Sequence, residues 1–178
     1  LGTGSLVVLG IILGLMMAFD MGGPVNKVAY TFAVTGLAAA GAATTAVQFQ
    51  VMAIVMAAGM TPPLGLALAT VLRKSLFSES EQENGKAAWL LGASFISEGA
   101  IPFAAADPLR VIPSIMVGSG LTGALVALFG NELRAPHGGI FVFPLVSNPL
   151  TYILALLIGT VVTALLVLVA KGIGNKAA

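Results

Sequence analysis

The sequence predicts an all-α fold: a polytopic α-helical membrane protein with about five spanning helices and two re-entrant helical hairpins. Of its 178 residues, 58% are hydrophobic and only 8% are charged, whereas an ordinary soluble domain carries roughly 25% charged residues. Uncharged runs cover residues 1–19, 28–72 and 111–131, and about 18 apolar residues are enough to cross a bilayer. We therefore expect residues 1–178 to form a single membrane-embedded domain.

The composition excludes several classes of function. A formal net charge of +1, one Trp and two Tyr provide neither a basic face nor a stacking platform for nucleic acid. The absence of cysteine excludes disulfides, thiolate metal sites and a cysteine nucleophile within this chain. The single histidine, His137, has no second ligand at a suitable spacing, so no metal site is predicted.

The first half of the chain is predicted to contain long helices. Residues 1–19 lack the basic start of a secretory signal and are typical of an internal span of a larger membrane protein. Residues 20–27, DMGGPVNK, form a turn because Gly-Gly-Pro bends the backbone tightly. The run 28–72 would be about 70 Å long as one helix, roughly twice the bilayer core. We place its break at residues 59–63, GMTPP, because two prolines remove two backbone donors.

A hydrophilic stretch separates this half from the next elements. Residues 76–86, LFSESEQENGK, are expected to form a mobile solvent loop. The apolar pieces 87–96 and 100–106 follow, and each is too short to cross a membrane. The sequence SEG separates them, which predicts a re-entrant helical hairpin with Glu98 at or near its tip. Such irregular backbone at membrane depth must be buried in protein or line a watery cavity.

The C-terminal part is predicted to hold two more spans around a second short piece. Residues 111–131 and 150–170 are each long and apolar enough to cross the bilayer. Residues 137–149, HGGIFVFPLVSNP, begin with a histidine and two glycines and are closed by prolines. This segment is the second predicted re-entrant hairpin.

Threading these elements through a bilayer predicts an orientation. The turn at 20–27, the segments 73–86 and 107–110 and the C-terminus fall on one side, which holds seven of the eight basic residues, with only Arg134 opposite. The positive-inside rule makes that side cytoplasmic. We therefore expect the 76–86 loop and the C-terminus to be cytoplasmic, and the two hairpins to approach mid-membrane from opposite sides.

Glu98 is the strongest candidate site residue. An ionisable side chain in a membrane segment is costly and persists where it faces a cavity or a partner. Its oxygens can accept hydrogen bonds from neighbouring hydroxyls of a sugar, and Gly99 beside it lets a ligand approach the backbone. The alternative is an interfacial carboxylate that caps a turn.

Other polar residues each have a site role and a structural role open to them. His137 is either a hydrogen-bonding or proton-accepting partner of a substrate or a satisfied polar residue at a hairpin entrance. An N-capping Asp107 paired with Arg110 is the structural alternative for that segment. Gln48 and Gln50 either line a cavity or join helices. Asp20, Asn26 and Lys27 either offer polar groups at a helix start or only shape the turn. These residues are Asp20, Asn26, Lys27, Gln48, Gln50, Asp107 and Arg110.

Three motifs resemble one known family. DMGGPVNKVAY, ISEGAIPFAAADPLRVIPS and APHGGIFVF are similar to segments of the fructose-family membrane component, enzyme IIC, of the bacterial sugar phosphotransferase system. The similarity extends over essentially the whole chain. It implies that the chain corresponds to the C-terminal portion of a larger permease in the bacterial inner membrane, without the earlier helices that the family is expected to use to form a homodimer.

The resemblance implies a group translocator. Such a protein binds fructose or a related hexose at mid-membrane and presents it for phosphorylation during uptake by the phospho-cysteine of a cytoplasmic IIB component. IIB and IIA components are the implied partners, and no bound cofactor is implied. The chain is then not catalytically complete without IIB.

The resemblance also implies where the sugar binds. In the wider glucose-type superfamily a Gly-Ile-Thr-Glu motif contacts sugar, and this chain has Phe-Ile-Ser-Glu at the similar position. Glu98 then contacts the sugar and accepts its proton, and His137 assists. The remaining implied sugar-site residues are Ser97, Gly99 and Gly138.

Two alternatives remain open at the level of sequence. An ion-coupled secondary transporter would use Glu98 as its proton or sodium site. A membrane scaffold without a substrate would bind no hexose. Formation of phosphorylated sugar, dependence on IIB and indifference to ion gradients distinguish the phosphotransferase from both.

Overall fold

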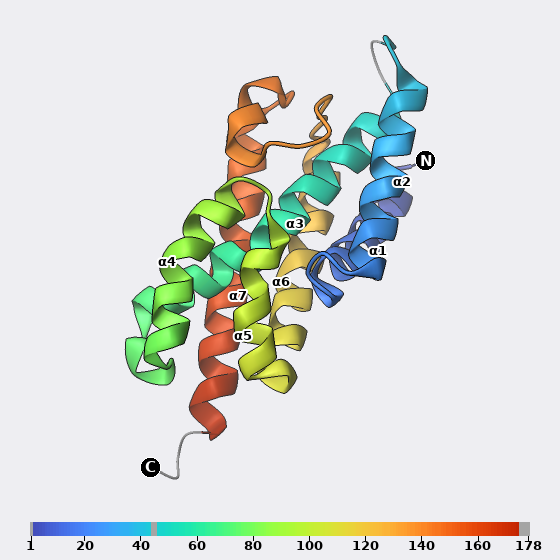
Figure 1. Ribbon diagram of the computed structural model, residues 1–178. Helices are drawn as coiled ribbons and strands as arrows, with labels where there is room; N and C mark the ends of the chain where they lie inside the picture. The colour runs from blue at the N-terminus through green and yellow to red at the C-terminus, as the bar shows by residue number, and fades with distance from the viewer. Residues whose placement is uncertain (1, 44–45, 175–178) are drawn as a thin grey trace.

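The computed structural model describes residues 2–43 and 46–174, and in this part of the chain all regular elements are helical, as predicted (Figure 1). The α-helices are α1 (Thr3–Phe19), α2 (Pro24–Ala40), α3 (Val47–Leu72), α4 (Glu79–Ala93), α5 (Ile101–Ala106), α6 (Pro108–Phe129) and α7 (Pro149–Gly174). Three short 3-10 helices connect them: η1 (Lys74–Leu76), η2 (Ser97–Ala100) and η3 (Gly139–Leu145).

Three of the described helices are long and apolar enough to cross a membrane. They are α3, α6 and α7, while α1 is apolar but shorter. This agrees with a membrane protein, although it does not confirm the predicted number of about five spans. α3 is the central helix, because 89% of its apolar window is buried, against 56% for α6 and 44% for α7.

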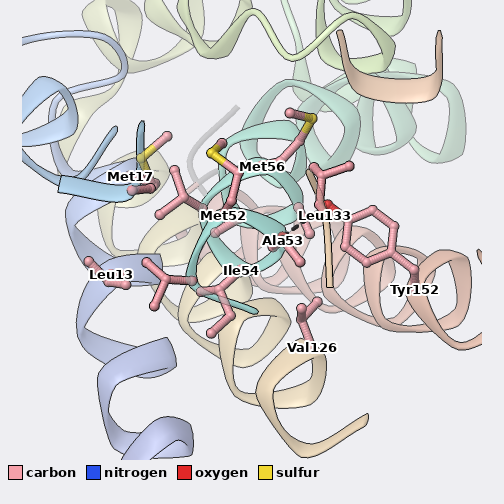
Figure 2. Close-up of a cluster of buried hydrophobic side chains, with 14 of the residues drawn as sticks. Leu13, Met17, Met52, Ala53, Ile54, Met56, Val126, Leu133 and Tyr152 are labelled. Carbon is pink, nitrogen blue, oxygen red and sulfur yellow. Dashed lines mark hydrogen bonds between the residues drawn. The ribbon is translucent and has the colours of Figure 1, made fainter. Parts of the chain in front are cut away.

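The apolar core is built around α3. Figure 2 shows Met52 and Met56 of α3 between Met17 of α1 on one side and Tyr152 of α7 on the other. The hydroxyl of Tyr152 donates to the carbonyl oxygen of Ala53 at 2.9 Å. This bond satisfies the only polar group of a fully buried aromatic side chain, as burial of tyrosine requires.

The exposed surface of α7 is apolar. Its exposed leucines and valines recur every three or four residues and therefore lie on one face of the helix. They are Leu150, Leu154, Leu157, Val161, Leu165 and Val169. Such a face fits contact with lipid chains and supports placement of α7 at the membrane-facing surface of the bundle.

The predicted helix break at residues 59–63 is wrong. α3 continues through Pro62 and Pro63 as one helix of 26 residues. The long apolar run breaks earlier, where α2 ends at Ala40 and Gly41 takes a positive φ of 55°. Glycine reaches that backbone conformation without steric cost, so it ends the helix more effectively than the proline pair does.

Two serines explain how α3 tolerates its prolines. In a regular α-helix the N–H groups of residues 62 and 63 would bond to the carbonyls of Ala58 and Gly59, but proline has no N–H. The hydroxyl of Ser119 in α6 donates instead to Ala58 O at 3.0 Å. The hydroxyl of Ser97 in η2 donates to Gly59 O at 2.8 Å. Both freed carbonyls are therefore satisfied from neighbouring elements, as the membrane interior demands.

Glycines allow α1 and α6 to pack backbone against backbone. A Cβ added at Gly10 would lie 2.9 Å from Gly123 C, and one added at Gly14 would lie 2.8 Å from Gly120 Cα. Any side chain at these positions would push the helices apart. Small residues spaced four apart are a common means of close helix association in membranes.

The segment 76–86 is helical rather than a loop. Residues 79–86 form the start of α4, and Ser78 makes a complete capping box with Glu81. The Ser78 hydroxyl accepts from Glu81 N at 3.2 Å, and Glu81 Oε2 accepts from Ser78 N at 2.9 Å. The hydrophilic composition correctly indicates solvent contact, but Ser78 and Glu81 also match the S-x-x-E pattern that starts a helix.

The Glu98 hairpin is present. α4 ends at Ala93, η2 carries Glu98, and α5 returns antiparallel to α4 (Figure 1). The second predicted hairpin, at 137–149, is a loop with the 3-10 helix η3 instead of a helical hairpin. Glycines at positive φ and two prolines prevent a longer helix there.

The turn at 20–27 lies deeper than predicted. Figure 1 shows the α1–α2 connection about half-way along the molecule, whereas the start of α6 and the C-terminal end of α7 lie at one end. The α1–α2 turn is thus set back from that end. It faces the tip of the Glu98 hairpin, and these two turns form the site described below.

The serine contacts to α3 can be tested by a double-mutant cycle. Ser119→Ala leaves the buried carbonyl of Ala58 without a partner, which is expected to cost about 1–3 kcal/mol. Pro62→Ala restores the N–H that this carbonyl lacks, so Ser119→Ala is expected to be nearly harmless in the Pro62→Ala background. The measurement is the free energy of unfolding of the complete protein in detergent solution.

Ser114→Ala is the matched control for that cycle. Ser114 is also a buried serine of α6, but its hydroxyl donates to Arg110 O within the same helix at 2.7 Å, a carbonyl that an intrahelical N–H already satisfies. Equal losses for Ser114→Ala and Ser119→Ala, or strict additivity of Ser119→Ala with Pro62→Ala, would contradict the assignment.

Candidate functional site

A cavity of about 200 Å³ lies where the α1–α2 turn, the hairpin tip and the start of the 137–149 loop meet. It is lined by Met17, Gly22, Asn26, Lys27, Tyr30, Phe95, Ser97, Glu98 and His137. The cavity is smaller than the roughly 300–1,000 Å³ of typical drug-sized pockets. Its size and polar lining suit a small polar solute.

Asp20 shapes the α1–α2 side of the cavity. Its two carboxylate oxygens accept from the backbone N–H groups of Val25, at 2.7 Å, and Asn26, at 2.9 Å, in the first turn of α2. The buried amide of Asn26 in turn donates to Met17 O at 2.7 Å. These bonds join the end of α1 to the start of α2, so Asp20 and Asn26 fix the turn that carries Lys27.

Phe95 shapes the hairpin tip. It takes a positive φ of 63° directly after α4, where Ile96 N donates to Leu91 O at 2.8 Å and Phe95 N donates to Gly92 O at 3.1 Å. This is the Schellman pattern, in which glycine is the usual left-handed residue. A bulky residue there is strained by about 1–3 kcal/mol and such strain clusters at functional sites.

The strained tip is fastened to α3. The Phe95 ring is buried against Gly59, where an added Cβ would meet Phe95 ring atoms. Ser97 lines the cavity, but its hydroxyl donates to Gly59 O. Both contacts are made with Gly59, the ring at its Cα and the Ser97 hydroxyl at the carbonyl that Pro63 leaves free, so they hold the tip that carries Glu98 against α3.

Glu98 projects into the cavity against Gly22. Gly22 has a positive φ of 98°, and a Cβ added there would lie 2.7 Å from Glu98 Cδ and 2.9 Å from Glu98 Cγ. Only glycine leaves room for the carboxylate at this point. Within the described residues the Glu98 carboxylate makes neither a hydrogen bond nor an ion pair, so its acceptor capacity is available to a ligand.

Aromatic contacts hold His137 at the opposite wall. The imidazole lies 4.9 Å from the Phe95 ring and 6.5 Å from the Tyr30 ring, between centroids. The Tyr30 hydroxyl donates to Pro136 O at 2.9 Å and so ties the histidine loop to α2. Gly139 packs directly on the backbone of Ala93. The imidazole nitrogens have no bonding partner in the part of the chain that the structure describes.

Three functional groups in the cavity therefore have no hydrogen-bond or ion-pair partner within residues 2–43 and 46–174: the Glu98 carboxylate, the His137 imidazole and the Lys27 ammonium. Charged and polar groups that the fold itself uses, such as Asp20 and Ser97, are fully engaged with backbone atoms. The three free groups offer an acceptor, a donor–acceptor and a cation to a small solute. The acceptor and the donor–acceptor suit the hydroxyls of a polyhydroxyl ligand.

Several predicted site residues lie elsewhere. Gly99 packs against Leu91 and Pro63, and Gly138 faces Val142, so neither lines the cavity. Gln48 borders a separate apolar groove of about 440 Å³ between α1, α2 and α3. Gln50 is half-buried in the first turn of α3 and lines neither space.

Asp107 and Arg110 belong to an ionic cluster about the far end of α7. Arg110 pairs with Asp107 at 3.0 Å as predicted, but the Asp107 side chain makes no capping hydrogen bond. Lys171 lies 3.6 Å from Asp107 and 3.3 Å from Glu81. Lysine and both carboxylates are largely buried here, so the cluster joins α4, α6 and α7 structurally. In the described ranges no group of three metal-ligating side chains occurs.

Four cavity residues escaped the sequence analysis: Met17, Gly22, Tyr30 and Phe95. Tyr30 follows Lys27 by three residues on a helix, a spacing that places both on one face. That signal was available. Phe95 carried no signal, because only its left-handed backbone brings its ring beneath the cavity.

Known proteins with similar sequences agree on one family. The chain is 59% identical over 174 residues to the PTS system fructose-specific EIIB'BC component of Rhodobacter capsulatus, an alignment that covers 96% of this chain and 29% of that protein. It is 49% identical over 171 residues to the fructose permease IIC component of Bacillus amyloliquefaciens, covering 96% and 54%. The chain belongs to the fructose-specific EIIC family.

Further similarity supports the assignment. The fructose-like permease IIC component 2 of Escherichia coli K12 is 50% identical over 173 residues, covering 97% of this chain and 46% of that protein. This EIIC chain thus spans about half, or less, of the length of these curated relatives. No protein-family model matches the chain, and no solved structure matches it.

The contact between Gly22 and Glu98 gives a structural prediction for this EIIC chain. Gly22→Ala is expected to destabilise the protein by about 1–3 kcal/mol, through backbone strain and the clash with the carboxylate. Glu98→Ala removes the clashing atoms and is expected to recover the part of the loss that the clash causes. The measurement is the thermal midpoint in detergent for the two single variants and the double variant.

Gly130→Ala separates strain from the clash. Gly130 has a positive φ of 67°, but an added Cβ there meets no atom within 4 Å. Gly130→Ala is expected to destabilise the protein only through backbone strain. Glu98→Ala is expected to leave that loss of stability unchanged. A Gly22→Ala loss that Glu98→Ala leaves unchanged would contradict the described packing.

Proposed function

We propose that this EIIC chain forms the sugar site of a permease that phosphorylates fructose or a related hexose during uptake. The observation that carries the proposal is the cavity that Glu98, His137 and Lys27 line together, each without a hydrogen-bond or ion-pair partner for its side chain among the described residues. The names of the relatives support the substrate and the system, since they are fructose-specific or fructose permease components of the phosphotransferase system.

Glu98 is proposed to bind and activate the sugar hydroxyl. An ionised carboxylate accepts hydrogen bonds from hydroxyls that are roughly twice as strong as neutral ones. In the transfer step the hydroxyl oxygen forms a bond to phosphorus, the bond from phosphorus to its donor breaks, and the hydroxyl proton passes to Glu98. His137 holds a second hydroxyl from the other wall and orients the sugar.

The phosphoryl donor is proposed to be a phospho-cysteine on a IIB partner. This chain has no cysteine, so a thiolate leaving group must come from another domain. By their names, relatives combine EIIB with EIIC in one chain, and the Bacillus subtilis protein also includes EIIA. We also propose that the permease is a homodimer in the bacterial inner membrane and that phosphoryl transfer takes place on its cytoplasmic side.

The role of Glu98 is tested by Glu98→Gln in the complete permease. The amide keeps the size of the side chain but cannot accept the proton, so the rate of sugar phosphorylation is expected to fall by roughly 100-fold or more. Hexose affinity is expected to fall by roughly 10- to 100-fold, because one charged hydrogen bond is lost. His137→Ala is expected to lower the rate less than Glu98→Gln does.

Matched controls complete that experiment. Glu83→Gln changes an exposed glutamate whose partner is Lys86 on α4, far from the cavity, and is expected to behave as wild type. Uptake is expected to yield phosphorylated sugar and to persist when ion gradients are collapsed. Near-normal rate and affinity for Glu98→Gln, or uptake of unmodified sugar that stops with the gradient, would refute the proposal.

Orientation in the membrane gives a second test. The end of the molecule that holds the α3–α4 connection carries most of the basic residues and is proposed to be cytoplasmic. A single cysteine at exposed Ser80, in a permease otherwise free of accessible cysteine, is expected to react only with a membrane-permeant reagent. One at Asn148, at the opposite end, is expected to react with an impermeant reagent from outside; the reverse pattern would invert the orientation.

A further inference from the structure

The Lys27 ammonium has no hydrogen-bond or ion-pair partner in the part of the chain that the structure describes. It lies in the first turn of α2 and lines the cavity beside Glu98 and His137. No carboxylate of the described residues comes within 4.0 Å of its ammonium group, whereas four other basic side chains of the described chain have such a partner. Those four are Lys86, Arg110, Arg134 and Lys171.

The nearest carboxylate in sequence is already occupied. Both oxygens of Asp20 accept from backbone N–H groups in the first turn of α2. Those bonds use the negative charge to balance the positive end of the helix. The Lys27 ammonium therefore has no ion-pair partner among residues 2–43 and 46–174, and it lines the same cavity as Glu98 at the hairpin tip.

A neutral hexose does not explain an uncompensated ammonium group. The hydroxyls of a sugar are already served by a carboxylate and an imidazole, whereas a lysine at a site of this kind favours an anion. The anion that the proposed reaction brings into the cavity is the phosphoryl group, which carries a charge of about −1.5 to −2. Lysine binds phosphate oxygens as a point charge.

We propose that the Lys27 ammonium binds the phosphoryl oxygens during transfer and in the sugar-phosphate product. This inference rests on the function proposed above and deepens it. As the sugar oxygen bonds to phosphorus and the sulfur–phosphorus bond to IIB breaks, the proton goes to Glu98 and the thiolate leaves with IIB. Lys27 remains an ammonium throughout and stabilises the charge on the phosphoryl oxygens that neither form nor break bonds.

If Lys27 binds the phosphoryl group and not the sugar, its substitution is expected to lower turnover without weakening sugar binding. Lys27→Met keeps the length and apolar stem of the side chain and removes the charge. Removal of one such donor costs roughly 100- to 1,000-fold in turnover. The KM for fructose is expected to stay within about twofold, because the ammonium does not serve the neutral sugar.

Product binding gives a readout that does not depend on turnover. The probes are fructose, fructose 1-phosphate and fructose 6-phosphate, titrated calorimetrically into the complete permease. Wild type is expected to bind one phosphate ester more tightly than fructose. Lys27→Met is expected to lose roughly 10- to 100-fold in affinity for that ester, the effect of one charged hydrogen bond, and Lys27→Arg is expected to retain most of it.

The outcomes separate this inference from the function on which it rests. Lys86→Met, which removes an exposed lysine of α4, is the control and is expected to match wild type in every titration. If wild type neither binds fructose nor yields phosphorylated sugar, the proposed function fails and the inference falls with it. If wild type does both, Lys27 alone is at issue.

Two results would then overturn the role of Lys27. Equal losses for fructose and its phosphate ester in Lys27→Met would make the lysine a sugar contact. Unchanged binding and turnover would make it a surface lysine of the shallow apolar hollow that it also borders beside Val28 and Phe32. Loss for the ester alone, with recovery in Lys27→Arg, supports the proposal.

Discussion

The fold and the cavity both depend on two carbonyl oxygens in α3. Pro62 and Pro63 free the carbonyls of Ala58 and Gly59 from the helix, and hydroxyls from α6 and η2 satisfy them. In hydrocarbon an unsatisfied carbonyl costs several kcal/mol, so these two bonds are conditions for a continuous α3. The bond from Ser97 also ties η2, which carries Glu98, to the central helix.

The cavity lies where backbone turns bring the hairpin tip and the His137 loop against α1 and the start of α2. Gly22, Phe95 and Gly139 all have positive φ and lie at the turns that converge on it. Two of them are glycines because a side chain would collide with Glu98 or with the backbone of Ala93. The third is a phenylalanine whose strain is offset by burial of its ring against Gly59. Such turns hold functional groups rigidly while leaving their polar atoms free.

The sequence predicts the helical class and the candidate acid because both follow from local chemistry. Apolar run length gives membrane helices, and a lone carboxylate between short apolar pieces gives the hairpin tip at Glu98. The error at Pro62 and Pro63 arises from a tertiary effect, since the hydroxyls that rescue the helix come from residues 97 and 119. No local pattern records those partners. The depth of the 20–27 turn was missed for the same reason.

Lys171 and Lys27 contrast a charge that the fold neutralises with one that it does not. Lys171 is buried with Glu81 and Asp107 beside it and the Phe77 ring 4.9 Å away, an arrangement that compensates the cost of burying a cation. Lys27 has no carboxylate partner among the described residues. Asp20 is only seven residues away, but both of its oxygens accept hydrogen bonds from backbone N–H groups. A fold that neutralises one ammonium group so fully leaves the other without a carboxylate partner among the described residues, and so able to bind an anion.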